Sequence, residues 1–134
     1  MTQRAVLLMD DDPRVVRALT KALECSDHRL FAAATLGEAF RILGEHGPEI
    51  DLVITELEPR VQGMLRAIQA ACKSLPVLVV TASGDRDVYA RAMACGAAEF
   101  LNKPIRAAEL RALLKRFCPS LCFGPSTLPL TMAA

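Results

Sequence analysis

The sequence lacks the features that would place it in a membrane or on nucleic acid. No apolar run approaches the roughly 18 residues of a membrane-spanning helix, and residues 1–4 lead into an expected strand without a signal peptide's apolar segment. The 16 basic and 15 acidic residues give a net charge of +1, too small to attract nucleic acid or an anionic membrane. We therefore expect a cytoplasmic protein whose partners are other proteins, with no direct contact to nucleic acid or membrane.

The cysteines also lack a ligand or disulfide pattern. They are odd in number, include no Cys-x-x-Cys pair, and have no histidine at ligand spacing. This usage is typical of a reducing compartment. A redox or metal role for Cys118 and Cys122 is the less favoured alternative to apolar tail residues, so no site is predicted there. The five are Cys25, Cys72, Cys95, Cys118 and Cys122.

Short apolar runs alternate five times with amphipathic stretches, and no internal repeat is visible. Strands buried on both faces and joined by right-handed helical crossovers imply a parallel sheet with helices on both faces. The chain is therefore predicted to be a doubly wound α/β domain. The expected strands are 4–9, 29–33, 51–55, 76–81 and 99–102, and the expected helices are about 12–24, 35–43, 64–72, 85–95 and 106–117.

Local signals mark the ends of several elements. Asp12 before Pro13 is a helix start, because the aspartate accepts from first-turn amides and proline tolerates the first helical position. Residues 35–38 have capping-box spacing, and Gly96 suits the left-handed end of a helix. Residues 118–134 contain three prolines and no charge, so we expect a domain at 1–117 followed by a tail or the start of a linker.

Polar residues end four of the expected strands at the edge where function sits in an open parallel sheet. Asp10 and Asp11 follow the first strand, Glu56 the third, Thr81 the fourth and Lys103 the fifth. Neighbouring carboxylates repel one another unless a cation such as Mg²⁺ holds them, and a hydroxyl with an ammonium suits a phosphoryl group. Taken singly, these residues are ordinary loop and capping residues. Their joint placement predicts a phosphoryl-handling site.

The chain resembles the receiver domain of two-component response regulators from residue 4 to about 117. Five runs carry the resemblance: VLLMDDDPRVVRAL, ATLGEAF, DLVITELEP, PVLVVTASG and CGAAEFLNKPI. It implies a flavodoxin-like fold with strand order 2-1-3-4-5. It also implies Mg²⁺-dependent transfer of a phosphoryl group from a histidine kinase or phosphotransfer protein to an aspartate that ends the third strand.

The resemblance also assigns roles to individual positions of this chain. Asp10 and Asp11 would form the Mg²⁺ pocket with residue 56 and the backbone carbonyl of Glu58. Thr81 would be the hydroxyl that follows the phosphoryl group, and Lys103 its ion-pair partner. Phe100 would occupy the position of the switch aromatic, although a phenylalanine ending a strand is otherwise more often a core residue.

The chain departs from the family pattern at the acceptor position. Counting from Asp51 places Glu56 there, whereas counting back from Pro59 and Gly63 places Thr55 there, and neither is an aspartate. We favour Glu56 with a one-residue deletion in the following loop, because that choice keeps the phase of the strand.

A glutamate at position 56 predicts a pseudo-receiver. Its longer carboxylate would pair with Lys103 and accept a hydrogen bond from the Thr81 hydroxyl. These contacts would hold the domain in one signalling state without a kinase. We do not expect an enzyme, and any activity would be autophosphorylation and autodephosphorylation. The alternative is an ordinary phosphorylatable receiver, with Glu56 as a poor acceptor or another carboxylate substituting for it. A nucleotide-binding flavodoxin-like enzyme is disfavoured because no Gly-rich loop follows the first strand.

In receivers, the face made by the fourth helix, fifth strand and fifth helix usually carries dimerisation and output. Mixed charge on that face would fix the register of a homodimer, but a solvated helix surface is the commoner explanation. An output domain or a separate partner protein would receive the signal. The charged residues are Arg86, Asp87, Arg91, Glu99, Arg106, Glu109, Arg111 and Lys115.

Overall fold

The computed structural model describes residues 4–10, 12–24, 28–56, 66, 68, 70, 75–82, 86–94 and 96–117. Residues 66, 68 and 70 are helical, and the rest of the helix expected at 64–72 lies outside the described residues, as do residues 118–134. Within the described part of the chain, no helix is long and apolar enough to cross a bilayer.

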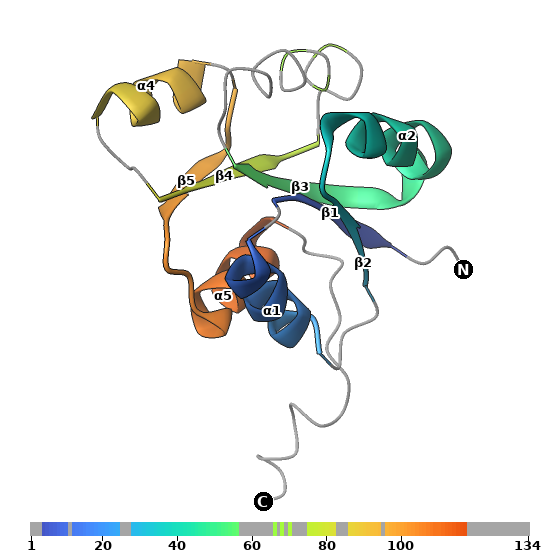
Figure 1. The fold of residues 1–134 in the computed structure, drawn as a ribbon, viewed down its shortest axis with the longest axis horizontal. Helices are drawn as coiled ribbons and strands as arrows, with labels where there is room; N and C mark the ends of the chain where they lie inside the picture. The colour runs from blue at the N-terminus through green and yellow to red at the C-terminus, as the bar shows by residue number, and fades with distance from the viewer. Residues whose placement is uncertain are drawn as a thin grey trace, which may run out of the picture.

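Five parallel strands form one sheet in the order β2-β1-β3-β4-β5, which confirms the predicted fold class and strand order (Figure 1). Each strand lies within one residue of its expected bounds, because the apolar runs that predict the strands are the segments buried in the sheet. The strands are β1 (Ala5–Met9), β2 (Arg29–Ala33), β3 (Ile50–Glu56), β4 (Val77–Thr81) and β5 (Glu99–Asn102).

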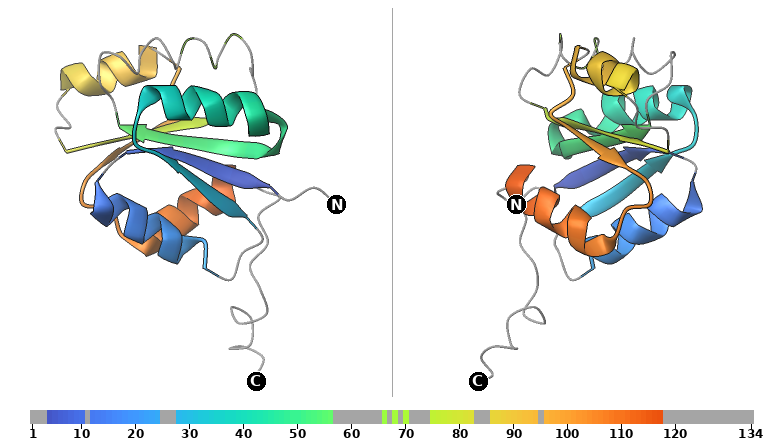
Figure 2. Two further views of the ribbon diagram at one scale, coloured as in Figure 1. Left: turned by 45° about the vertical axis from the view of Figure 1, so that its right-hand side comes forward. Right: turned by 90° about the vertical axis from the view of Figure 1, so that its left-hand side faces the viewer.

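Helices cover both faces of the sheet, with α1 and α5 on one face and α2 and α4 on the other (Figures 1 and 2). This layering is the doubly wound arrangement that right-handed crossovers produce. The helices are α1 (Pro13–Ala22), α2 (Leu36–His46), α4 (Arg86–Ala94) and α5 (Ala107–Phe117), and a short 3₁₀ helix, η1 (Gly47–Glu49), precedes β3.

Two predicted helix ends were wrong. α1 stops at Ala22 rather than near residue 24, because the Glu24 amide bonds to the Lys21 carbonyl three residues back, in a tighter turn than the α-helix makes. α2 continues through Gly44, where a break was expected, and ends at His46. A glycine inside a helix costs only about 1 kcal/mol relative to alanine, which the packing of the helix can offset.

The predicted start signals are present as hydrogen bonds. Asp12 Oδ1 accepts from the Arg14 amide at 2.9 Å, with Pro13 at the first helical position. Thr35 Oγ1 accepts from the Glu38 amide at 3.1 Å. Gly96 has a φ of 94°, a left-handed value that glycine adopts without steric cost, directly after the described end of α4.

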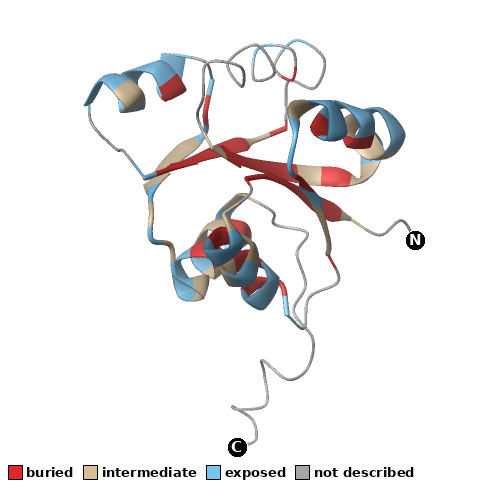
Figure 3. Cartoon of the chain, in the orientation of Figure 1, coloured by how far each residue is buried: buried red, intermediate tan, exposed pale blue. Residues whose placement is uncertain are grey.

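The sheet divides the apolar interior into two clusters that share none of the described residues (Figure 3). Successive side chains of a strand point to opposite faces, so Leu7 packs towards α2 and α4 while Leu8 packs towards α1 and α5. Both leucines are fully buried. The central strands are therefore held from both sides, which fixes the positions of their carboxyl ends.

An ion-pair cluster at the opposite, amino edge of the sheet was not predicted from the sequence. Asp51 accepts from Arg4 Nε at 2.6 Å and lies 2.8 Å from His28 Nε2, and the His28 side chain is almost fully buried. These contacts join the amino ends of β1, β2 and β3. They lie at the edge of the sheet opposite the candidate site, which is at the carboxyl ends of the strands.

Candidate functional site

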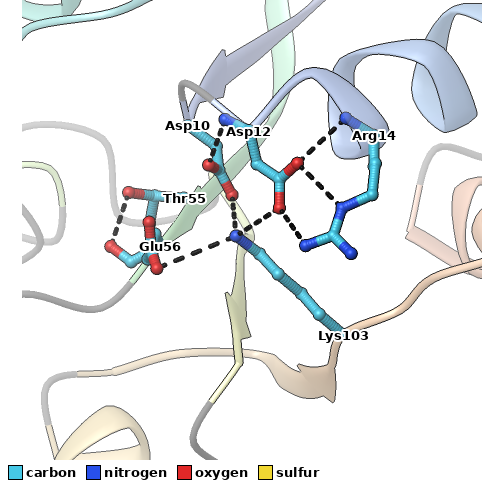
Figure 4. Close-up of polar contacts among 6 residues, drawn as sticks. All are labelled: Asp10, Asp12, Arg14, Thr55, Glu56 and Lys103. Atoms are coloured by element: carbon cyan, nitrogen blue, oxygen red, sulfur yellow. Dashed lines mark hydrogen bonds and ion pairs between the residues drawn. The ribbon is translucent and has the colours of Figure 1, made fainter.

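The expected residues Asp10, Glu56, Thr81 and Lys103 lie at the carboxyl edge of the sheet. Asp10 follows β1, Glu56 ends β3 and Thr81 ends β4. Lys103 follows β5, and its amide donates to the Thr81 carbonyl at 2.8 Å, which anchors the start of the lysine side chain beside β4. From there the side chain reaches towards the ends of β1 and β3 (Figure 4).

The Lys103 ammonium lies among three carboxylates. Its Nζ is 3.0 Å from Asp10 Oδ2, 3.4 Å from Asp12 Oδ2 and 3.7 Å from Glu56 Oε2 (Figure 4). The Asp10 side chain is fully buried and the Lys103 side chain is 8% exposed. One cation therefore balances several negative charges in a site where water screens them weakly.

Asp12 belongs to this site, although sequence reasoning gave it only a capping role. Its carboxylate caps α1 and also accepts from the Arg14 guanidinium, at 3.2 Å from Nε and 3.1 Å from Nη2. The same Oδ2 that contacts Arg14 contacts Lys103. The run of three aspartates at 10–12 is the one sequence signal for the contact between Asp12 and Lys103. Sequence spacing does not show which of the three lies beside a lysine 91 positions later.

Charge interactions shift two pKa values in this cluster. Burial lowers the pKa of the Lys103 ammonium, but the Asp10, Glu56 and Asp12 carboxylates more than offset this, so its pKa lies above the ordinary value of 10.5. Hydrogen bonds from the Arg14 side chain and amide hold the pKa of Asp12 far below its ordinary value of 3.8. Lys103 and Asp12 are therefore both charged at neutral pH.

The two candidates for the acceptor position occupy different surroundings. Thr55 is fully buried, and its hydroxyl donates to the Glu56 carbonyl at 3.1 Å. The Glu56 side chain is 31% exposed and reaches the ammonium of Lys103. Of the two, only Glu56 is thus brought into the charged cluster.

Two of the remaining expected residues, Thr81 and Phe100, are described by the structure. Thr81 is buried at the end of β4. Phe100 is half-buried in β5, and its ring meets the ring of Tyr89 edge-on with centroids 5.4 Å apart. Asp11 and Glu58, expected to contribute to a metal pocket, lie outside the described residues.

Comparison with known families agrees with this arrangement. The family model described as "Response regulator receiver domain" matches residues 6–115, which cover the strands and helices described above except the first residue of β1 and the last two residues of α5. The chain belongs to this family. As a response regulator receiver domain, it acts in two-component signal transduction.

Relatives of the receiver domain come from plants and bacteria. It is 32% identical over 113 residues to the "two-component response regulator-like APRR9" of Arabidopsis thaliana, covering 81% of this chain and 24% of that protein. It is 30% identical over 132 residues to the "response regulator MprA" of Mycobacterium sp. (strain KMS), covering 94% of this chain and 56% of that protein. The chain thus spans only part of these relatives.

Solved structures show the same fold. The receiver domain superposes on a response regulator from Thermotoga maritima with a TM-score of 0.79 and 25% identity, covering 89% of this chain and 99% of that one. A receiver domain protein from Clostridium thermocellum gives a TM-score of 0.74 and 28% identity, covering 87% and 95%.

The chemistry of Asp10 fits a hard cation. Its Oδ1 accepts from the Asp12 amide at 2.9 Å, whereas its buried Oδ2 lies 3.0 Å from the Lys103 ammonium and accepts no other hydrogen bond within the described part of the chain. Carboxylate oxygens of this kind suit Mg²⁺, which receiver domains generally bind at this site. The described residues alone do not bring together three metal-ligating side chains.

We expect Asp12 to make the receiver domain less stable in acid. Because its pKa is lowered in the folded state, its stabilisation is complete above its ordinary pKa of 3.8 and is lost as the pH falls through the folded value. Asp12→Asn keeps a capping side chain but removes the charge. The free energy of unfolding, measured with urea, should be lower for the variant than for the wild type at about pH 6, and the difference should shrink in more acidic solution.

A matched control is Glu24→Gln, which removes an exposed carboxylate that pairs with no described residue. It should shift stability little at either pH. A difference between Asp12→Asn and the wild type that stayed constant from neutral to strongly acidic pH would contradict the prediction.

Proposed function

We propose that this receiver domain is a pseudo-receiver, in which Glu56 replaces the phosphoacceptor aspartate and signalling proceeds through protein contacts without phosphoryl transfer. One observation carries the proposal. A glutamate carboxylate ends β3 and lies 3.7 Å from the ammonium of Lys103, within the cluster that Asp10 and Asp12 complete. The negative charge is the same as that of an aspartate, but it lies one methylene further from the backbone and reaches the Lys103 ammonium without a kinase.

The length of the glutamate side chain argues against efficient transfer. Its carboxylate is one methylene, about 1.5 Å, further from the backbone than that of an aspartate. Attack on phosphorus requires the nucleophile in line with the leaving group, and a misplacement of about 1 Å can cost about a hundredfold in rate. A carboxylate of this length would also extend into the space that an incoming phosphoryl group would need.

The contacts of Lys103 suggest which state the domain holds. The ammonium is shared between Glu56 and the two aspartates at the end of β1, so Glu56 tethers the segment after β5 to the end of β3. Phe100 lies on β5, three residues before Lys103. We infer that this tether fixes the segment around β5 in one signalling state, with Thr81 and Phe100 as the switch positions.

Magnesium has a reduced role in this proposal. Asp10, Asp11, Glu56 and the backbone carbonyl of Glu58 would hold the ion, which when bound would neutralise the carboxylates and a phosphoryl group. Lys103 already supplies a positive charge 3.0 Å from Asp10. Because the Glu56 carboxylate is one methylene longer than that of an aspartate and lies 3.7 Å from the Lys103 ammonium, we expect Mg²⁺ to bind more weakly here than in a receiver with an aspartate at position 56.

The rival is a phosphorylatable receiver that accepts a phosphoryl group from a histidine kinase or phosphotransfer protein with Glu56 as a poor acceptor. It is favoured by the placement of Asp10, Thr81 and Lys103 at the ends of neighbouring strands. In both cases the partner is a cytoplasmic protein or an output domain, and a homodimer through α4, β5 and α5 is a further arrangement to test by light scattering.

An intact-mass measurement separates the two. The full chain is incubated with Mg²⁺ and acetyl phosphate, a small acyl-phosphate donor, with Glu56→Gln as a control that lacks the carboxylate. We expect the wild type to gain no more mass than the control. A stoichiometric gain of one phosphoryl group by the wild type alone would establish the rival.

A further inference from the structure

The hydroxyl of Thr55 is a buried polar group in apolar surroundings. Because side chains alternate along a strand, the Thr55 side chain lies on the same face of β3 as that of Val53. Val53 belongs to the apolar cluster on the side of α2 and α4. So do Met9 on β1 and Val79 on β4, which are the cross-strand partners of Thr55. Thr55 itself is fully buried, so its hydroxyl lies between apolar residues of the two adjacent strands.

The packing of the sheet does not require a hydroxyl at this position. Burying a hydroxyl costs free energy unless it forms a hydrogen bond, and valine has nearly the same branched shape without that cost. The hydrogen bond of the Thr55 hydroxyl is local, because it donates to the carbonyl of the next residue, Glu56, at 3.1 Å (Figure 4). The hydroxyl therefore constrains the backbone of Glu56.

Glu56 lies where the pairing of β3 changes. Among the described residues, the register of β3 with β1 ends at the pair of Thr55 and Met9. The register with β4 continues for one more pair, which joins Glu56 to Val80. The Thr55 hydroxyl thus binds the Glu56 carbonyl one residue beyond the described register with β1, and it adds a constraint to the one that β4 provides.

The position of this backbone affects the contact between Glu56 and Lys103. The Lys103 ammonium lies 3.7 Å from the Glu56 carboxylate, which is further than its 3.0 Å from Asp10 and its 3.4 Å from Asp12. A shift of Glu56 by about 1 Å would therefore take the pair beyond ion-pair distance. The Glu56 side chain is also 31% exposed, so water competes with Lys103 for its carboxylate.

We propose that Thr55 is a positioning residue, whose hydroxyl fixes the Glu56 backbone and thereby keeps the Glu56 carboxylate beside Lys103. Thr55 in this way sets how strongly the end of β3 is tethered to the segment after β5. The proposal rests on the tether between Glu56 and Lys103 that belongs to the pseudo-receiver, but not on the absence of phosphoryl transfer.

The test follows the ¹⁵Nζ chemical shift of Lys103 by NMR in the full chain, with and without Glu56→Gln. In the wild type this substitution removes a carboxylate from beside the ammonium and should shift the resonance, whereas exposed Lys21 on α1 should not respond. In Thr55→Val, the response of Lys103 to Glu56→Gln should fall to less than half of the wild-type value. Thr55→Ser keeps the hydroxyl and should retain most of the response.

Stability is the second measurement, because a purely structural role of Thr55 predicts the opposite order of the two variants. Thr55→Val fills the same volume and should have a urea midpoint no lower than that of Thr55→Ser, which loses a buried methyl group. Thr20→Val is the matched control, since it also deletes a hydroxyl that donates to a backbone carbonyl, that of Val16 at 2.8 Å, but at an exposed position of α1. It should leave the response of Lys103 unchanged.

A wild-type response in Thr55→Val would overturn the proposal while leaving the tether itself intact. No response to Glu56→Gln in the wild type would overturn the tether and the role of Thr55 together. A response that fell as far in Thr55→Ser as in Thr55→Val would assign the effect to packing. The wild type alone gives a further check, because a buried and hydrogen-bonded hydroxyl proton exchanges slowly with water. The absence of a protected Thr55 hydroxyl resonance would also contradict the proposal.

Discussion

Replacing Glu56 with aspartate is expected to raise the rate of phosphoryl incorporation from acetyl phosphate by about a hundredfold or more. The substitution keeps the charge beside Lys103 and withdraws the carboxylate by one methylene, which opens the space for an in-line phosphoryl group. Asp10, Thr81 and Lys103 remain at the neighbouring strand ends. The initial rate with Mg²⁺ would be followed by intact mass.

Three controls sharpen this experiment. Glu56→Gln removes the carboxylate and should show no incorporation, and omission of Mg²⁺ should abolish any gain by Glu56→Asp. Glu56→Asp combined with Asp10→Asn should lose most of the gain if the metal pocket is required. A rate for Glu56→Asp no higher than for the wild type would mean that side-chain length is not the obstacle, and that the altered loop after β3 has itself removed the activity.

Substitution of Lys103 by methionine is expected to lower the free energy of unfolding by about 3 kcal/mol. Methionine retains an unbranched apolar stem but leaves the fully buried Asp10 carboxylate, together with Asp12 and Glu56, without the ammonium. Removing one partner of a buried ion pair is costly because the remaining charge is poorly solvated. Urea unfolding at neutral pH measures the loss, and Lys21→Met, an exposed lysine on α1, should change stability by no more than about 0.5 kcal/mol.

A double-mutant cycle separates the charge effect from a packing effect. Asp10→Asn with Lys103→Met should recover a substantial part of the lost stability, because the buried charge and its partner are removed together. Added Mg²⁺ should stabilise Lys103→Met more than it stabilises the wild type, since a second cation then replaces the missing one. A loss below about 1 kcal/mol for Lys103→Met, with no coupling to Asp10, would contradict the cluster's energetic role.

Local sequence signals were sufficient for the architecture. The runs around Leu7 and Leu78 are apolar without interruption because their strands are buried on both faces, and such runs are visible without a structure. Asp12-Pro13 and Thr35 marked helix starts because capping depends on residues only two or three positions away. The predicted strand bounds identified the residues at the carboxyl ends of the strands. They therefore also predicted that Asp10, Glu56, Thr81 and Lys103 lie at one edge of the sheet.

Contacts between residues far apart in the sequence could not be predicted from local sequence signals. The second role of Asp12 depends on the direction of its side chain and on the reach of Lys103, neither of which is encoded by spacing. The pairing of His28 with Asp51 joins residues 23 positions apart at the amino edge.

The division of the apolar interior by the sheet has an evolutionary consequence. Since the two clusters have no described side chain in common, a repacking change beneath α2 or α4 is separated from α1 and α5 by a full layer of hydrogen-bonded backbone. Substitutions on opposite sides should have additive effects on stability, as they do at independent sites. One layer can therefore diverge between paralogues while the opposite layer stays constant, without loss of the scaffold.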